Sequence, residues 1–129
     1  MKRVLITGGA GFIAHHLIFY LINNTNWDIV ALDRLDYSGN LNRLDNILSN
    51  LKKEQKSRIK VIFHDLKSEI NPWIKKEIGN IDIILHLAAG SHVHYRTLQF
   101  QRLNYMNFCK AYISLLQETY TLHMVNQKD

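Results

Sequence analysis

Three residues with little or no side chain follow the apolar run at residues 4–6 near the start of the chain. Gly8, Gly11 and Ala14 give the spacing G-x-x-G-x-x-A between a predicted strand and a predicted helix. At such a junction the first glycine permits a sharp turn, the second lets backbone approach a pyrophosphate, and the third small residue lets the helix pack closely on the sheet. Free N–H groups at the helix start would face the phosphates. The spacing predicts a dinucleotide-binding loop, although a plain strand-to-helix turn also uses glycines.

An acidic residue at the end of the next predicted strand supports this interpretation. Asp33 follows the glycines by about 20 residues, where a carboxylate can accept a hydrogen bond from a ribose 2′-hydroxyl. The same carboxylate would repel a 2′-phosphate, so the sequence favours NAD over NADP. Arg34 comes next in the chain and argues the other way, because a neighbouring arginine can hold a 2′-phosphate.

Strands and helices are predicted to alternate along the chain. Short apolar runs predict strands at residues 3–7, 28–32, 59–63 and 81–87. Helical spacing of apolar residues predicts helices over residues 12–23, about 41–54, and from about 98 to beyond 116. Asn71 followed by Pro72 predicts the start of a further short helix that ends near Gly79. Because the strands are apolar on both faces, we expect an α/β fold whose parallel sheet is covered on both sides.

Four segments in order resemble one protein family: TGGAGFIAHHL (7–17), LDRLDYSGNLNRL (32–44), HDL (64–66) and LHLAAGSHV (85–93). They are similar to extended short-chain dehydrogenase/reductases of the NAD-dependent epimerase/dehydratase type. The likeness is strongest to nucleotide-sugar 4,6-dehydratases, which are lyases, and it covers about residues 3–93. It implies NAD as cofactor and a Rossmann-type, doubly wound parallel sheet of about four strands in the order 3-2-1-4, with flanking helices.

The resemblance also implies which residues contact the cofactor. The pyrophosphate would lie against Gly8, Gly11, Phe12 and Ile13. Asp33 would hold the adenosine ribose, and the adjoining wall would consist of Arg34, Tyr37, Gly39 and Asn40. The adenine would be flanked by Asp65 and Leu66, and the central region of the cofactor would lie beside Leu87, Ala88 and Ala89. Plain core packing would equally explain Leu66 and Leu87.

The chain departs from the family pattern in its later part. Relatives usually carry HLAAESHVDRS where this chain has HLAAGSHVHYR, so Gly90 replaces a glutamate and His94 an aspartate. The match fades beyond Val93. The family's Tyr-x-x-x-Lys pair is absent, because none of the six tyrosines has a lysine four positions later. A tyrosine without a positive neighbour is a poor base at neutral pH, so we assign no catalytic residue.

Composition argues against several other classes of function. The basic residues are dispersed apart from a small cluster at residues 52–60, which predicts a solvated helix end and no nucleic-acid partner. No apolar run reaches the roughly 18 residues that cross a bilayer. The lone cysteine, Cys109, suits a reducing compartment, and a cytoplasmic location is expected. The histidines 86, 92 and 94 lack cysteine or carboxylate neighbours at ligand spacing, so no metal site is expected.

Three hypotheses for function remain open. We expect residues 1–129 to form an incomplete NAD-binding Rossmann domain, without the C-terminal region that would hold a nucleotide sugar. It would be the NAD-binding portion of a dehydratase or epimerase-like enzyme that oxidises its sugar at C4 when complete. Alternatively, it is a non-catalytic dinucleotide-binding or interaction module, or an inactive truncated gene product. The apolar fourth strand would lie at an edge of the sheet unless residues 121–126 pair with it, which predicts self-association.

Overall fold

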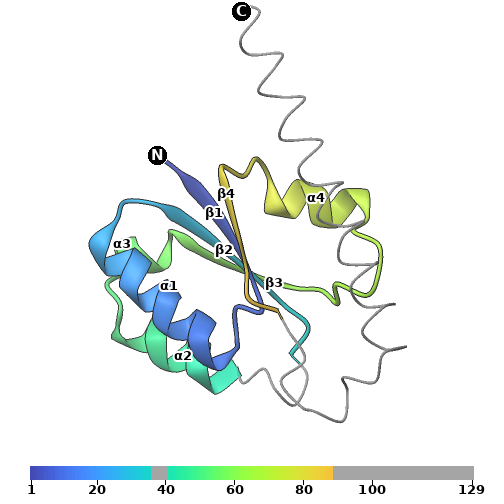
Figure 1. Cartoon of the computed structure of the whole chain (residues 1–129). Coiled ribbons are helices and arrows are strands. Elements are labelled where there is room, and N and C mark those ends of the chain that lie inside the picture. The colour runs from blue at the N-terminus through green and yellow to red at the C-terminus, as the bar shows by residue number, and fades with distance from the viewer. Residues whose placement is uncertain (36–40, 89–129) are drawn as a thin grey trace, which may run out of the picture. The chain divides into compact units, whose positions relative to one another are not determined.

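The computed structural model describes residues 1–35 and 41–88, in which strands and helices alternate (Figure 1). The strands are β1 (Arg3–Thr7), β2 (Asp28–Asp33), β3 (Ile59–Phe63) and β4 (Ile83–His86). The helices are α1 (Phe12–Asn24), α2 (Leu41–Asn50), α3 (Lys53–Lys56) and α4 (Pro72–Ile78). The chain divides into two compact units. All four strands and α1 to α3 belong to the first, Met1–Asp65 with Ile81–Ala89, and α4 belongs to the second.

The four strands form one parallel sheet in the order β3-β2-β1-β4. Val4 in the central strand β1 pairs with Ile29 of β2 and with Ile83 of β4, and Leu32 pairs with Ile62 of β3. This confirms the predicted fold class and strand order. Because all strands are parallel, their carboxyl ends meet at one edge of the sheet, where ligands bind in folds of this kind.

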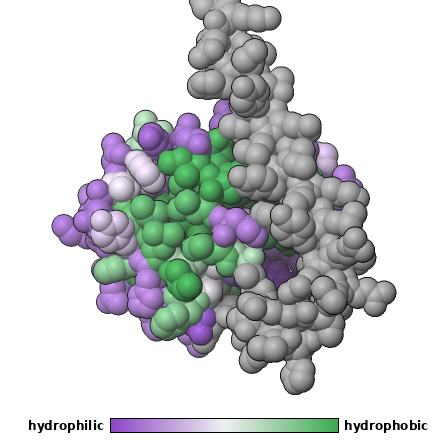
Figure 2. All heavy atoms as spheres, in the orientation of Figure 1, coloured by the Kyte–Doolittle hydropathy of each residue, from purple (hydrophilic) through white to green (hydrophobic). Residues whose placement is uncertain are grey.

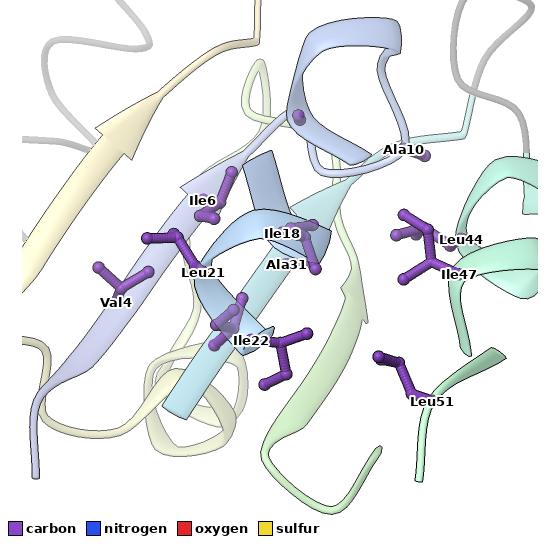
Figure 3. Close-up of a cluster of buried hydrophobic side chains, with 12 residues drawn as sticks. Val4, Ile6, Ala10, Ile18, Leu21, Ile22, Ala31, Leu44, Ile47 and Leu51 are labelled. Carbon is purple, nitrogen blue, oxygen red and sulfur yellow. The ribbon is translucent and has the colours of Figure 1, made fainter. Parts of the chain in front are cut away.

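The core of the first unit lies between the sheet and the helices α1 and α2 (Figure 3). Alternate residues of the two central strands, Val4, Ile6 and Ala31 among them, pack against the buried face of α1. The intervening residues Leu5 and Val30 are also fully buried, as a central parallel strand requires. Each fully buried Leu or Ile contributes roughly 1.5–3 kcal/mol of hydrophobic stabilisation. This core fixes the carboxyl ends of β1 and β2.

Arg58, which precedes β3, ties the opposite end of the sheet to α1. Its guanidinium donates hydrogen bonds to the carbonyl oxygens of Ile22 at 2.8 Å, Thr25 at 2.9 Å and Trp27 at 3.2 Å. The Ile22 and Thr25 carbonyls lie at the C-terminal end of α1, which carries the negative end of the helix dipole, and the Trp27 carbonyl lies just before β2. The Arg58 guanidinium therefore caps the C-terminal end of α1, which is the helix end opposite the predicted binding loop.

The helix expected over residues 41–54 is two helices. Lys52 has extended backbone, with φ −67° and ψ 155°. The helix is therefore interrupted: α2 ends at Asn50 and α3 begins at Lys53. The weak helix formers Ser49 and Asn50 occupy the last turn of α2. The strand expected at residues 81–87 is shorter, Ile83–His86, and the helix expected from about residue 98 lies outside the described residues.

The short helix of the second unit begins as predicted. The Asn71 side chain accepts a hydrogen bond from the Ile74 N–H at 2.9 Å, and Pro72 is the first helical residue. Gly79 follows the helix with φ 72°, a backbone conformation that favours glycine. Asn71 and Gly79 therefore cap both ends of α4.

Candidate functional site

Gly8 makes the turn out of β1. Its φ is +70°, and a Cβ atom here would come within 2.8 Å of the Ala88 backbone, just after β4. Side chains rarely tolerate either condition. Gly8 is therefore glycine because the ends of β1 and β4 lie so close together.

Gly9 is equally confined, although the predicted spacing did not single it out. A Cβ atom at this position would be 2.7 Å from the Ala31 Cβ atom of β2. The N–H groups of Gly8 and Gly9 both point at the Leu32 carbonyl oxygen, at 2.8 Å and 3.3 Å. We call residues 8–11, between β1 and α1, the glycine loop. Its first half, Gly8 and Gly9, is thus fastened to the end of β2.

Gly11 differs from both. It is the N-cap of α1 with an ordinary φ of −72°, and its N–H donates to the Gly8 carbonyl oxygen at 2.9 Å. A Cβ atom here would be 3.0 Å from that oxygen and would meet no other described atom within 4 Å. Apart from this one tight contact, a side chain here would enter space that is open among the described residues.

The first turn of α1 lies next to that space. Gly11, the N-cap residue, has no side chain to cap this helix end, and the first turn holds no acidic residue. Phe12 and Ile13 are 67% and 69% exposed, whereas Ala14 is 2% exposed and packs in the core. The N–H groups that begin a helix have no partner within it and carry the positive end of its dipole. This end of α1 can therefore receive an anion.

Asp33 is a buried carboxylate at the end of β2, only 7% exposed. Its Oδ2 accepts a hydrogen bond from the Ala10 N–H at 2.9 Å, and its Oδ1 accepts one from the Leu35 N–H at 2.7 Å. Leu35 has φ 53°, which is uncommon for a residue with a side chain. The carboxylate thus contacts both the glycine loop and the turn that leaves β2.

Arg34 and Asp65, from the ends of β2 and β3, form an ion pair. The Arg34 Nη1 lies 3.9 Å from the Asp65 Oδ2, and the two side chains are 39% and 40% exposed. Exposed pairs of this kind contribute little to stability. The pair nevertheless places a carboxylate beside Arg34, a cation that would favour a 2′-phosphate.

Thr7, the last residue of β1, joins β1 to the end of β4. Its buried hydroxyl hydrogen-bonds to the His86 Nδ1 and accepts a longer bond, 3.4 Å, from the Ala88 N–H. Burial lowers the pKa of His86 from its usual 6.5, because it disfavours the charged imidazolium. A neutral imidazole therefore holds this hydroxyl near neutral pH.

These features fit a dinucleotide. A bare Gly11 beside the start of α1 suits a pyrophosphate, because the missing side chain lets a ligand approach the N–H groups of the first turn, which holds no acidic residue. At the end of β3, the His64 Nε2 is buried without a hydrogen-bond partner among the described residues. Such atoms are uncommon in native proteins.

The sequence model of the GDP-mannose 4,6-dehydratase family matches residues 5–127. The chain belongs to this family. The membership confirms the resemblance to NAD-dependent epimerases and dehydratases that the four segments indicated.

Individual members of the dehydratase group are also similar. The chain is 38% identical over 107 residues to human (Homo sapiens) dTDP-D-glucose 4,6-dehydratase, covering 82% of this chain and 29% of the human protein. It is 37% identical over 97 residues to Escherichia coli dTDP-glucose 4,6-dehydratase, covering 70% and 24% respectively. The chain thus spans less than a third of either relative.

The fold is also found in solved structures. One is dTDP-glucose 4,6-dehydratase from Bacillus anthracis in complex with NAD, with a TM-score of 0.60 and 25% identity, covering 87% of this chain and 34% of that one. Another is a UDP-glucuronic acid 4-epimerase variant from Bacillus cereus, also solved with NAD. Its TM-score is 0.56 and its identity 30%, and the match covers 78% of this chain and 31% of that one. Family relatives of this fold therefore crystallise with NAD.

Within this member of the family, most predicted site residues lie at one edge of the first unit. Gly8, Gly11, Phe12, Ile13, Asp33, Arg34, Asp65, Leu87 and Ala88 all follow the carboxyl ends of its strands. Leu66 belongs to the second unit. The predicted contacts Tyr37, Gly39, Asn40 and Ala89 lie outside the described residues.

Sequence reasoning missed several residues at this edge. Arg43 of α2 reaches back to the loop, with its Nη1 3.5 Å from the Ala10 carbonyl oxygen and its guanidinium 5.8 Å from the Phe12 ring centre. No local motif could have found it, because the contact spans 33 positions. Gly9 could have been found from the adjacent glycines. Thr7 could have been found from its place at the strand end.

Two kinds of feature are not found in the described part of the chain. Residues 1–35 and 41–88 contain no group of three or more histidine, cysteine, aspartate or glutamate side chains placed to hold a metal ion. The same residues include no helix with the length and apolar character that crossing a membrane requires.

Proposed function

We propose that this chain is the NAD-binding portion of a nucleotide-sugar 4,6-dehydratase or epimerase-like enzyme. The observation that carries the proposal is the space beside Gly11, in the second, open half of the glycine loop. At Gly11 the missing side chain leaves space beside the uncapped start of α1, while Asp33 lies next to the same loop. Family membership supplies the expected ligand.

The residues of this edge would divide the work of binding. The N–H groups of Phe12 and Ile13 would hold the pyrophosphate, because N–H groups at a helix start attract phosphate oxygens, and Gly11 would leave room for it. Asp33 would face the adenosine ribose and favour NAD over NADP, with Arg34 already paired to Asp65. The predicted wall residues Tyr37, Gly39 and Asn40 would complete this side, and Ala89 would continue the Leu87–Ala88 side.

Bound NAD would supply a hydride acceptor for oxidation of a sugar at C4. The sugar would be that of a nucleotide sugar of the dTDP-glucose type, held by a further region of the complete enzyme. None of the chain's tyrosines begins a Tyr-x-x-x-Lys pair, so the usual base of this chemistry is lacking in the 129 residues. A dinucleotide-binding module without catalysis of its own is the second candidate. The lone Cys109 suits a cytoplasmic setting for either.

Two assays on the purified chain test the proposal. NAD should raise the temperature of thermal unfolding, since a ligand that binds only the folded state stabilises it. The chain alone should not convert dTDP-glucose or UDP-glucose to a 4-keto sugar, detected by its alkaline absorbance. No thermal shift with NAD at millimolar concentration would contradict the binding role. Formation of the 4-keto sugar would contradict the assignment of no catalytic residue.

We also propose that the isolated chain self-associates through β4. Among the described residues this strand pairs only with β1, and Ile83, Ile84 and Leu85 are partly exposed. Figure 2 shows hydrophobic surface in the middle of the visible face. Apolar strand edges pair readily with other chains. Ile84→Lys should therefore shift the protein toward the monomer in light scattering, and a wild-type monomer at high concentration would contradict the idea.

A further inference from the structure

Asp33 has two partners before any ligand is considered. Its Oδ2 accepts from the Ala10 N–H at 2.9 Å and its Oδ1 accepts from the Leu35 N–H at 2.7 Å. The residue is only 7% exposed, so little water competes for either oxygen. Binding a ribose hydroxyl does not by itself require that both carboxylate oxygens accept backbone N–H groups, so these bonds indicate a further role.

The two N–H groups belong to different loops. Ala10 lies between Gly9 and Gly11 in the turn from β1 to α1, and Leu35 lies in the connection that leaves β2. Leu35 also has the unfavourable φ of 53° and packs against the core. The buried Asp33 carboxylate therefore bridges the glycine loop and the turn that leaves β2.

The other described backbone hydrogen bonds that the loop donates hold its first half to β2 or lie within the loop, and none of them engages the Ala10 N–H. The Gly8 and Gly9 N–H groups share the Leu32 carbonyl, and the Gly11 N–H bonds within the loop to Gly8. The Ala10 N–H depends on Asp33, and Ala10 itself is fully buried. A buried N–H that loses its acceptor is costly, and bonds to an ionised acceptor are among the stronger ones.

We propose that Asp33 is a positioning residue that clamps the glycine loop, at Ala10, to the turn that leaves β2 at Leu35. The clamp holds the Ala10–Gly11 backbone in place for the pyrophosphate. Asp33 then contributes to dinucleotide affinity even when the ligand has no adenosine ribose hydroxyl to offer it. The ligand part of this inference rests on the proposed function, whereas the clamp is a property of the chain by itself.

Amide hydrogen exchange of the ligand-free chain tests the clamp. Asp33→Ala should speed exchange at the Ala10 and Leu35 amides by about tenfold or more, because each loses a charged acceptor. Asp33→Asn should protect one of the two, since its single carbonyl oxygen can accept from one N–H. Asp45→Ala removes an exposed carboxylate of α2 and should change neither amide. Unchanged exchange in both Asp33 variants would overturn the clamp.

Calorimetric titration with NAD and with its 2′,3′-dideoxyadenosine analogue, which has neither hydroxyl on the adenosine ribose, tests the consequence for binding. If Asp33 acts only on the ribose, Asp33→Ala will bind the dideoxy analogue as tightly as wild type does. The clamp instead predicts a loss of about tenfold or more for this analogue too, with partial recovery in Asp33→Asn. A wild-type chain that binds neither ligand would contradict the proposed function, and the exchange experiment would still decide the clamp.

Discussion

The two halves of the glycine loop differ in what their glycines are for. Gly8 and Gly9 have no room for a side chain, because the Ala88 backbone and the Ala31 side chain lie where a Cβ atom would be. Gly11 has an ordinary φ and open space beyond one carbonyl oxygen of its own loop. The fold therefore requires glycine at both positions of the first half, whereas at Gly11 one tight contact with a carbonyl oxygen is all that opposes a side chain among the described residues. A glycine that the fold requires less strictly is the better indication of a ligand.

The largest effect is expected in the closed half. Gly8→Ala places a side chain at φ +70° and 2.8 Å from the Ala88 backbone, so it combines backbone strain with a clash. We expect it to lower the free energy of unfolding by about 3 kcal/mol. Urea denaturation measures this, with Gly11→Ala as the matched variant and a loss below about 1 kcal/mol. Equal losses in the two variants would remove the distinction between the halves.

The open half should show the opposite behaviour. Gly11→Val fills the space beside the start of α1, so we expect NAD affinity to fall by at least about 100-fold while the fold stays largely intact. Calorimetry measures the affinity, and circular dichroism of the same sample reports the fold. A variant that binds NAD as wild type does would show that the loop is only a turn.

A change at the far end of α1 separates stability from binding. Arg58→Met removes three hydrogen bonds to carbonyl oxygens but keeps most of the apolar stem. We expect a loss of about 2 kcal/mol in the free energy of unfolding, with NAD affinity unchanged below the melting range. Arg58→Lys keeps the charge, so its free energy of unfolding should lie between those of the wild type and Arg58→Met. An equal loss of NAD affinity would mean that the binding edge depends on the whole helix.

The smallest expected effect concerns His86 at the end of β4. Its pKa lies below 6.5 in the folded chain, so the unfolded chain binds this proton first as the pH falls. The stability that neutral His86 contributes is present above about pH 6.5 and is lost as the pH drops through the lowered pKa. An NMR titration should find His86 titrating below 6.5, and His86→Asn should make stability less dependent on pH there. A pKa at or above 6.5 would contradict this.

The sequence predicted the parts of this molecule that depend on local pattern. Apolar β-branched runs gave the strands, and Asn71-Pro72 gave the start of α4. The spacing of Gly8, Gly11 and Ala14 placed the loop correctly. The break after Asn50 was missed because the apolar helical spacing continues through Leu51.

Contacts between distant segments could not be predicted in the same way. That Gly9 lies against Ala31, and that Arg43 reaches the loop, follows from how α1, α2 and β2 pack. Asp33 shows the limit most clearly. Its position at the strand end was readable from the sequence, but its bonds to the Ala10 and Leu35 N–H groups depend on the folded loops.

The central claim is that the open half of the loop and Asp33 together form an NAD site. Calorimetric titration of the wild-type chain with NAD and with NADP tests it most directly. The account predicts that NAD binds more tightly than NADP, because Asp33 lies beside the loop and Arg34 is paired with Asp65. Equal affinity for the two cofactors, or binding of neither, would contradict it.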